Sequence, residues 1–286
     1  MKNVLEKLWE KKITLLVYIG LFILGLINII PVFWTILTSI KFPVDTLTIP
    51  PTWIFTPTLK HQLLVWTDLG YQNYFVNSLI VSTVSSALMV GLGSLAAYGF
   101  SRLRTTASLA ILFFLLGVRM FPQLLLAIPY YLIAQNMGLY DTHLILVLVY
   151  NALEISFVIW MLRGFFLAIS TDLEGAAMLD GCSEFEAFWK IVLPNVLPGI
   201  VATFFLIFLF SINEYMFASI LTGSGARTMP PAIAAQFRAG GGGYMEYWNQ
   251  GAAAATGMIV PTFIILLFIQ KPLIRGLTFG MIEDKS

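Results

Sequence analysis

Charged and amide side chains interrupt several long apolar segments of this sequence. The charged ones are Arg119, Glu154 and Glu214. A charge in hydrocarbon is costly, so such a group faces a water-filled cavity, a partner or an opposite charge. Carboxylates, planar amides and aromatic faces in such a cavity could bind a neutral, hydroxyl-rich solute. The candidates for a solute pathway are Asn213, Glu214, Asn151, Glu154, Arg119, Gln123, Tyr150 and Tyr215.

The spacing of these side chains groups some of them. Arg119 and Gln123 are four residues apart, and Asn151 and Glu154 are three apart, so each pair would share one face of a helix. The alternative is structural, with Arg119 pairing with Glu154 or Glu214 to hold helices together. Both interpretations stay open at the level of the sequence.

Membrane-spanning helices must position these side chains. Of the 286 residues, 58% are hydrophobic and only 11% are charged, whereas a soluble domain has about 25% charged residues. A helix rises about 1.5 Å per residue, so about 20 apolar residues cross a bilayer core. We therefore expect an all-α, polytopic membrane protein with six transmembrane helices. The six apolar segments are roughly 13–40, 75–100, 107–133, 142–167, 199–222 and 251–275.

The first apolar run is too long for a cleaved signal sequence. It continues from Ile13 to Ile40, and the first alanine of the chain is Ala87, so no Ala-x-Ala cleavage site follows it. We interpret it as a retained helix.

The distribution of basic residues predicts the orientation. Lysines and arginines concentrate on the side of the N-terminus, which the positive-inside rule assigns to the cytoplasm. We expect a cytoplasmic N-terminal tail over 1–12, one transmembrane domain over 13–275 and a cytoplasmic C-terminal tail over 276–286.

The outer connections are 41–72, rich in proline and tryptophan, and 223–250. The glycine run 240–243 in the second is expected to form a flexible external loop, because no Gly-Lys-Ser/Thr follows it. No metal site is expected, since one cysteine and two histidines lack the ligand spacing.

The cytoplasmic connection 168–198 has the pattern of two short helices. Ser170, Thr171 or Asp172 can cap the first, and Gly181 can end it. Ser183 and Glu186 have the Ser-x-x-Glu spacing of a capping box, so a second helix should start there and run to about Val192. A folded amphipathic element of this kind is typical of a docking site for a soluble partner.

At this connection the sequence resembles the permease subunits of ABC importers. Their signature is Glu-Ala-Ala, three residues, Gly, nine residues, Ile, one residue, Leu-Pro. Here the matching residues are Ala176, Ala177, Gly181, Ile191, Leu193 and Pro194. Gly175 stands where the signature has Glu, and Glu174 is displaced by one position.

Other segments extend the resemblance to the maltose-type, carbohydrate-uptake permeases over nearly the whole chain. They include Ala96–Arg102, Met120–Pro122, Leu162–Phe166 and Asn213-Glu214. They are similar to the smaller, six-helix partner of the permease pair.

The resemblance implies a type I ABC importer transmembrane fold in a bacterial cytoplasmic (inner) membrane. It also implies a second permease subunit, two copies of an ABC ATPase, an extracytoplasmic solute-binding protein and a sugar substrate. ATP and Mg²⁺ would bind the ATPase, because this chain has no Gly-x-x-x-x-Gly-Lys-Ser/Thr and is not itself an enzyme. The residues implied in ATPase coupling are Glu174, Gly175, Ala176, Ala177, Met178, Leu179, Asp180, Gly181, Phe185, Ile191, Leu193 and Pro194.

Two other functions compete with the importer. A proton-coupled secondary carrier could use Glu154 and Glu214 as titrating groups, with six helices as one half of a repeat pair. A channel or purely structural membrane subunit is the third hypothesis. The carrier gives no reason for the residue spacing between 171 and 194.

Overall fold

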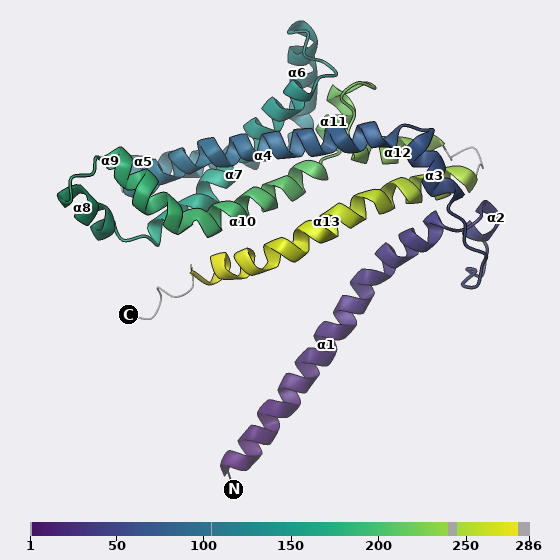
Figure 1. The fold of residues 1–286 in the computed structure, drawn as a ribbon, viewed down its shortest axis with the longest axis horizontal. Helices are drawn as coiled ribbons and strands as arrows, with labels where there is room; N and C mark the ends of the chain where they lie inside the picture. The colour runs from purple at the N-terminus through teal and green to yellow at the C-terminus, as the bar shows by residue number, and fades with distance from the viewer. Residues whose placement is uncertain (1, 104, 240–244, 280–286) are drawn as a thin grey trace. The chain divides into compact units, whose positions relative to one another are not determined.

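A computed structural model describes residues 2–103, 105–239 and 245–279, with side chains described for 12–103, 105–238, 246–267 and 270. These residues form helices and no strand (Figure 1). The helices of the first half are α1 (Lys2–Ser39), α2 (Pro43–Thr46), α3 (Lys60–Thr67), α4 (Tyr71–Arg102), α5 (Thr106–Arg119), α6 (Gln123–Asn136) and α7 (His143–Leu167). Those of the second half are α8 (Thr171–Leu179), α9 (Glu184–Ala187), the π-helix η1 (Phe188–Val192), α10 (Leu193–Ile212), α11 (Met216–Leu221), α12 (Met229–Ala239) and α13 (Met245–Phe279).

Within the described residues, five helical stretches are long and apolar enough to cross a membrane, and a bent pair of helices raises the number to six. The predicted all-α, multi-span class is therefore confirmed. The five unbroken stretches are Lys12–Ser39, Tyr71–Arg102, His143–Leu167, Glu184–Ile212 and Glu246–Leu267.

The third predicted segment, 107–133, is not one straight helix. It consists of α5 and α6, which meet at a bend of 85° (Figure 1). Pro122 lies at the break and provides the reason, because proline lacks an N–H and disfavours helical geometry in the residue before it. A continuous hydropathy signal hid this break.

The fifth predicted segment also differs from the structure. The second helix of the connection 168–198 does not end near Val192 but continues without a gap from α9 through η1 into α10. The hydrogen-bonding pattern changes within η1, where the N–H of Leu193 donates to the carbonyl of Phe188, five residues back instead of four. Pro194 follows directly, and because it has no N–H, it cannot continue the helical hydrogen bonding at this point. At the other end α10 stops at Ile212, and α11 follows as a separate short helix.

The chain divides into two compact units, each considered by itself. The first contains residues 1–70 and 233–259, and the second contains 71–232 and 260–286. The prediction of one transmembrane domain over 13–275 stays a prediction. Helix α1 already begins at Lys2 and α13 continues to Phe279, so parts of both predicted tails are helical. The rest of the C-terminal tail and Gly240–Gly243 lie outside the described residues.

In the first unit, a lysine is buried among aromatic rings. Lys41 is fully buried, and its Nζ donates to the carbonyl of Thr52 at 2.7 Å. The same ammonium lies 4.3 Å from the centre of the Trp34 ring. Burial lowers the pKa of Lys41. The contacts of the ammonium fasten the chain after α1, because a buried cation needs such partners.

In the second unit, α4 packs against α7, and α10 packs on both. Small residues of α4 allow the close approach. A Cβ at Gly93 would lie 2.7 Å from Cγ1 of Val158 on α7. This framework holds the connection 168–198 at one end, where α8 and α9 lie in Figure 1.

Candidate functional site

Helix α8 begins and ends as its sequence predicts. Ser170 is the N-cap, and its side chain accepts from the N–H of Asp172. Asp172 and Glu174 occupy the first turn, where the helix dipole favours anions. Gly181 ends the element with φ of 93°, a conformation in which a side chain would be strained.

Helix α9 carries the predicted capping box. The Ser183 side chain accepts from the N–H of Glu186, and the Glu186 carboxylate accepts from the N–H of Ser183. Lys190 adds an ion pair to Glu186 at 2.8 Å, four residues along. The connection is therefore a helical hairpin of α8, a turn at Gly181, and α9, and we call residues 170–187 the coupling hairpin.

A polar network fixes the coupling hairpin to α4. Glu174 is only 8% exposed, and its carboxylate accepts from the Tyr98 hydroxyl at 2.9 Å and from Nε of Arg102 at 2.8 Å. Arg102 also donates to the carbonyl of Phe166 at the end of α7. Glu174 therefore faces its own chain. The sequence did not identify Tyr98 and Arg102 as site residues, because more than seventy positions separate them from Glu174.

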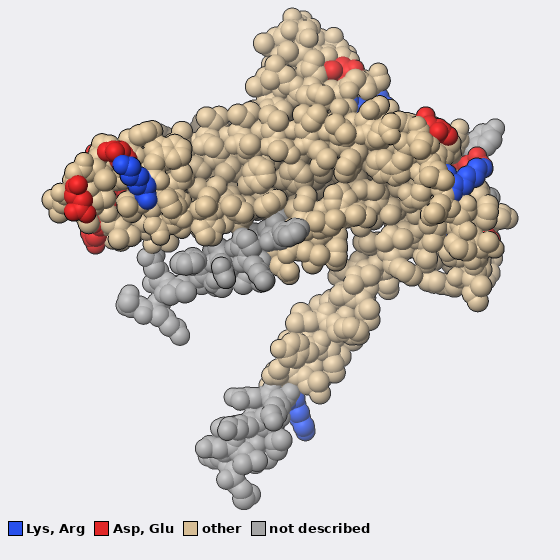
Figure 2. Space-filling model, in the orientation of Figure 1, with Lys and Arg blue, Asp and Glu red and all other residues tan. Residues whose placement is uncertain are grey.

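The outer surface of the coupling hairpin is apolar and exposed. Leu179 is 91% exposed, Phe185 69% and Met178 44%. The remaining predicted residues differ in accessibility: Ala176, Asp180, Gly181 and Pro194 are exposed, Gly175, Ile191 and Leu193 are half-buried, and Ala177 is buried. Figure 2 shows acidic and basic side chains gathered at this end, whereas the long helices of the second unit present few charges on the face shown. The apolar tip is thus surrounded by charge.

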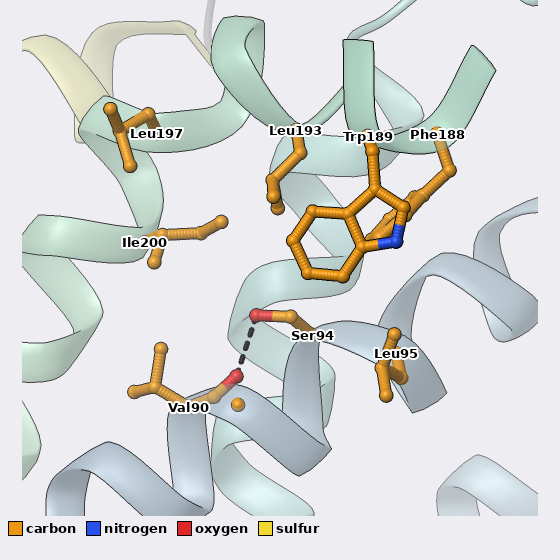
Figure 3. Close-up of a pocket in the computed structure, with 9 residues that line it drawn as sticks. Val90, Ser94, Leu95, Phe188, Trp189, Leu193, Leu197 and Ile200 are labelled. Carbon is orange, nitrogen blue, oxygen red and sulfur yellow. Dashed lines mark hydrogen bonds between the residues drawn. The ribbon is translucent and has the colours of Figure 1, made fainter. Parts of the chain in front are cut away.

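Next to the coupling hairpin, α4 and α10 enclose an apolar groove of about 390 Å³. Trp189 and Phe188 of η1 lie at one side of it, and Leu95 lies on the opposite wall (Figure 3). Ser94 contributes a hydroxyl, which donates to the carbonyl of Val90 at 2.6 Å. Apart from the Ser94 hydroxyl and the Trp189 indole N–H, the lining side chains are apolar, so the groove is better matched to hydrocarbon than to a sugar.

The predicted pathway residues form two groups, and each group includes a residue of α7. In the first, Nη2 of Arg119 lies 2.7 Å from Oε2 of Glu154, so the structural pairing considered from the sequence is present. The guanidinium also lies 4.5 Å from the Phe157 ring centre. Arg119 ends α5 and Gln123 begins α6, so they do not share a helix face as expected. The bend nevertheless brings both to one cavity.

In the second group, Glu214 connects the break after α10 to α7. Its carboxylate accepts from the N–H groups of Phe217 and Ala218, at 2.9 and 3.0 Å, and so caps α11. It also accepts from the hydroxyl of buried Tyr150 at 2.8 Å. Glu214 therefore acts as a carboxylate that holds the helix break together.

The amides and the second tyrosine have different surroundings. Asn213 is exposed at the break, with its amide donating to the carbonyl of Leu209. Tyr215 is half-buried beside it. Asn151 and Glu154 both lie on α7, three residues apart, as their spacing in the sequence predicted. The side-chain amide of Asn151 donates to the carbonyl of Val147 in the same helix. In the described part of the chain, no cluster of acidic, histidine or cysteine side chains could hold a metal.

At the opposite end of α7, a third cluster was not predicted. The carboxylate of Asp141 accepts from the N–H groups of Gly225 and Ala226, both at 2.9 Å. Asn77 of α4 donates to the carbonyls of Gly225 and Arg227. These contacts fix the segment after α11 to the starts of α4 and α7. Asp141 has φ of 60°, but its sequence context gave no sign of the distant partners.

Comparison with known proteins identifies the family. Residues 89–278 match the model of the binding-protein-dependent transport system inner membrane component, so the chain belongs to that family. The matched region contains the coupling hairpin and both groups of pathway residues. The chain is thus a multi-pass membrane permease component of ABC-transporter type, not the ATPase subunit.

Curated relatives match over nearly their whole length. A probable ABC transporter permease of Sinorhizobium fredii is 34% identical, covering 91% of this chain and 92% of the relative. The trehalose/maltose transport system permease protein of Thermococcus litoralis is 32% identical, covering 95% and 97%. The sulfoquinovosyl glycerol transport system permease protein of Agrobacterium fabrum is 31% identical, covering 92% of each.

A solved structure has the same fold. It is that of a bacterial ABC transporter involved in the import of the acidic polysaccharide alginate, with a TM-score of 0.70. The match covers 91% of this chain and 96% of the other at 18% sequence identity. The predicted importer transmembrane fold is confirmed at this level.

Proposed function

We propose that this chain is a permease subunit that imports a sugar or sugar-like solute by alternating access. The curated relatives named for trehalose, maltose and sulfoquinovosyl glycerol support a carbohydrate substrate. The polar residues at the two helix breaks support a hydrated passage, because such groups are costly against lipid.

The proposal includes the partners that the family implies. A second permease would complete the passage, and two copies of an ABC ATPase would bind ATP and Mg²⁺ in the cytoplasm. An extracytoplasmic binding protein would deliver the solute, as in the alginate importer solved in complex with its periplasmic protein. The membrane would be the bacterial inner membrane, with both termini of this chain in the cytoplasm.

The observation that carries the proposal is the construction of the coupling hairpin. Leu179 and Phe185 are exposed at its tip, while Glu174 is buried and held by Arg102. An exposed apolar tip on a fixed base is suited to fill a groove on a soluble partner, because burial of apolar surface stabilises docking. Movement of that partner would then reach α4 and α10 through the contacts at the base.

The test is co-purification of the tagged chain with its ATPase, followed by ATP hydrolysis and sugar uptake in reconstituted vesicles. Leu179→Asp places a charge on the exposed tip, so we expect loss of most of the bound ATPase and at least a tenfold loss of uptake. Phe185→Asp should act in the same direction.

Ile54→Asp is the matched control, because Ile54 is 94% exposed on a loop of the other unit. It should leave ATPase recovery unchanged. Normal ATPase recovery and uptake with both hairpin variants would show that the hairpin is not the docking element.

The secondary-carrier hypothesis is less compatible with the two carboxylates. Glu214 accepts three hydrogen bonds and Glu154 faces Arg119, so both have fixed structural contacts. A carrier would support uptake driven by a proton gradient in vesicles that contain no ATPase. The importer requires ATP and loses uptake when the ATPase is removed.

A further inference from the structure

The bend between α5 and α6 forms a small cavity with a polar wall. Its volume is about 50 Å³, and α5, α6 and α7 all contribute to it. Pockets that enclose a drug-sized ligand measure about 300–1,000 Å³, so this cavity can admit a hydroxyl-bearing edge of a solute but not a whole sugar ring. The polar side chains of the lining are Arg119, Gln123, Tyr130 and Ser156.

The ion pair beside this cavity retains unused hydrogen-bonding capacity. In the described part of the chain, Arg119 contacts Glu154 and the face of Phe157, which leaves several of its five N–H donors without a protein acceptor. Oε2 of Glu154 is buried against the guanidinium, but 19% of the Glu154 side chain and 29% of the Arg119 side chain stay exposed, so both can still contact a solute. Unused donors and acceptors therefore lie side by side.

We infer that Arg119, Glu154 and Gln123 bind hydroxyl groups of an uncharged sugar at this bend and disfavour anionic sugars. The inference rests on the proposed function and narrows its substrate class. Each sugar hydroxyl both donates and accepts, so neighbouring hydroxyls can accept from the guanidinium and donate to the carboxylate.

The opposite charges of Arg119 and Glu154 cancel, and this favours uncharged sugars over anionic ones at the bend. Arg119 is already compensated by Glu154, so a carboxylate on the solute would compete with Glu154 for the guanidinium and be repelled by it. Gln123 and Phe121 are exposed at the same bend and can contact the part of the sugar that remains outside the cavity. The aromatic rings there supply the apolar face that sugar rings stack on.

The test measures binding to the assembled permease and ATPase complex in lipid nanodiscs, without the binding protein. The probes are trehalose and maltose, which are uncharged, and a disaccharide of uronic acids. We expect the wild type to prefer an uncharged probe. Glu154→Gln keeps the size of the side chain but leaves Arg119 uncompensated, so the affinity ratio should shift about tenfold toward the uronate.

Glu246→Gln is the control for loss of a carboxylate from an ion pair, because Glu246 faces Lys60 at 3.7 Å on an exposed surface. Its affinity ratio should equal that of the wild type. The inference is overturned if the wild type binds the uronate as tightly as both uncharged probes, or binds neither uncharged probe. It is also overturned if an assembled Glu154→Gln complex has the same ratio as the wild type, whatever its thermal stability.

Gln123→Ala covers the case in which Glu154→Gln fails to assemble. Gln123 is exposed and belongs to no ion pair, so this variant should assemble and weaken binding of the uncharged probe about fivefold. Unchanged affinity in an assembled complex would overturn the inference. These outcomes differ from failure of the proposed function, in which no ATPase co-purifies and ATP drives no uptake of any sugar.

Discussion

Asp141 combines an unusual backbone conformation with a charge-dependent contact. Its φ of 60° is in the left-handed region, which Asp and Asn tolerate better than most residues. Burial alone would raise the pKa of Asp141, but backbone N–H groups of Ala226, Gly225, Gly223 and Ser224 outweigh burial and lower it below 3.8. The ionised carboxylate therefore stabilises the folded state.

The replacement Asp141→Asn tests this contact with little change in backbone preference. We expect it to destabilise the protein by about 1–2 kcal/mol at neutral pH, because a charge-assisted acceptor of two N–H groups is lost. Since folding lowers the pKa, the stabilisation is complete above the unfolded value of 3.8 and is lost as the pH falls through the folded value. Thermal unfolding in detergent at pH 7 and well below pH 3.8 measures the difference between variant and wild type.

The exposed carboxylate of Asp180 provides the control, since Asp180→Asn should change the melting temperature little at either pH. A difference for Asp141→Asn that does not shrink in acid would mean that shape, rather than charge, explains its effect.

At the scale of secondary-structure elements, the turn of the coupling hairpin depends on a single glycine. A Cβ at Gly181 or at Gly175 would meet no atom within 4 Å, so the two positions differ in backbone conformation and not in space. Gly181 has φ of 93°, whereas Gly175 lies within α8. Gly181→Ala should destabilise the hairpin by about 1 kcal/mol or more, and Gly175→Ala should stabilise α8 by about 1 kcal/mol.

Hydrogen exchange of the amides between 172 and 187 measures both effects in the same experiment. Faster exchange is expected for Gly181→Ala and slower exchange for Gly175→Ala. Equal behaviour of the two variants would refute the role assigned to the left-handed turn.

Local signals predicted these elements well. The Ser183 to Glu186 spacing gave the capping box, and Gly181 gave the turn, because both depend on residues within one or two helical turns. The break at Pro122 was obscured because hydropathy averages over a window and the residues on both sides are apolar.

Partners that are distant in the sequence were harder to predict. The sequence named Glu154 as one of two partners for Arg119, since charges in lipid are rare and few choices exist. It did not link Glu174 to Tyr98 and Arg102, or Asp141 to the segment after α11. Those contacts depend on helix packing, which one sequence without its relatives does not reveal.

At the scale of the whole molecule, the proposed orientation can be tested by labelling. In a Cys182→Ser background, a cysteine at Ile54 should react with a membrane-impermeant maleimide in intact cells, and a cysteine at Asp180 should react only in inverted vesicles. Both positions are exposed in the structure, so accessibility depends on the side of the membrane. The chain is expressed without the proposed ATPase, because docking would cover the hairpin.

The labelling pattern is decisive in either direction. Reaction at both positions from the same side would contradict three membrane crossings between them and would make the bent α5–α6 pair a re-entrant loop. A reversed pattern would place the coupling hairpin outside the cell, where no ATPase could reach it.

The unbroken helical path from Glu184 to Ile212 has a mechanical consequence. It contains 29 residues, so it is about 42 Å long and connects Phe185 at the hairpin tip to the break at Asn213. Such a helical path can tilt as one body about the region where α10 packs against α4 and α7. A small displacement of Phe185 would then move Asn213 in the opposite direction. The π turn of η1 lies between them and is the place at which the helical path would bend.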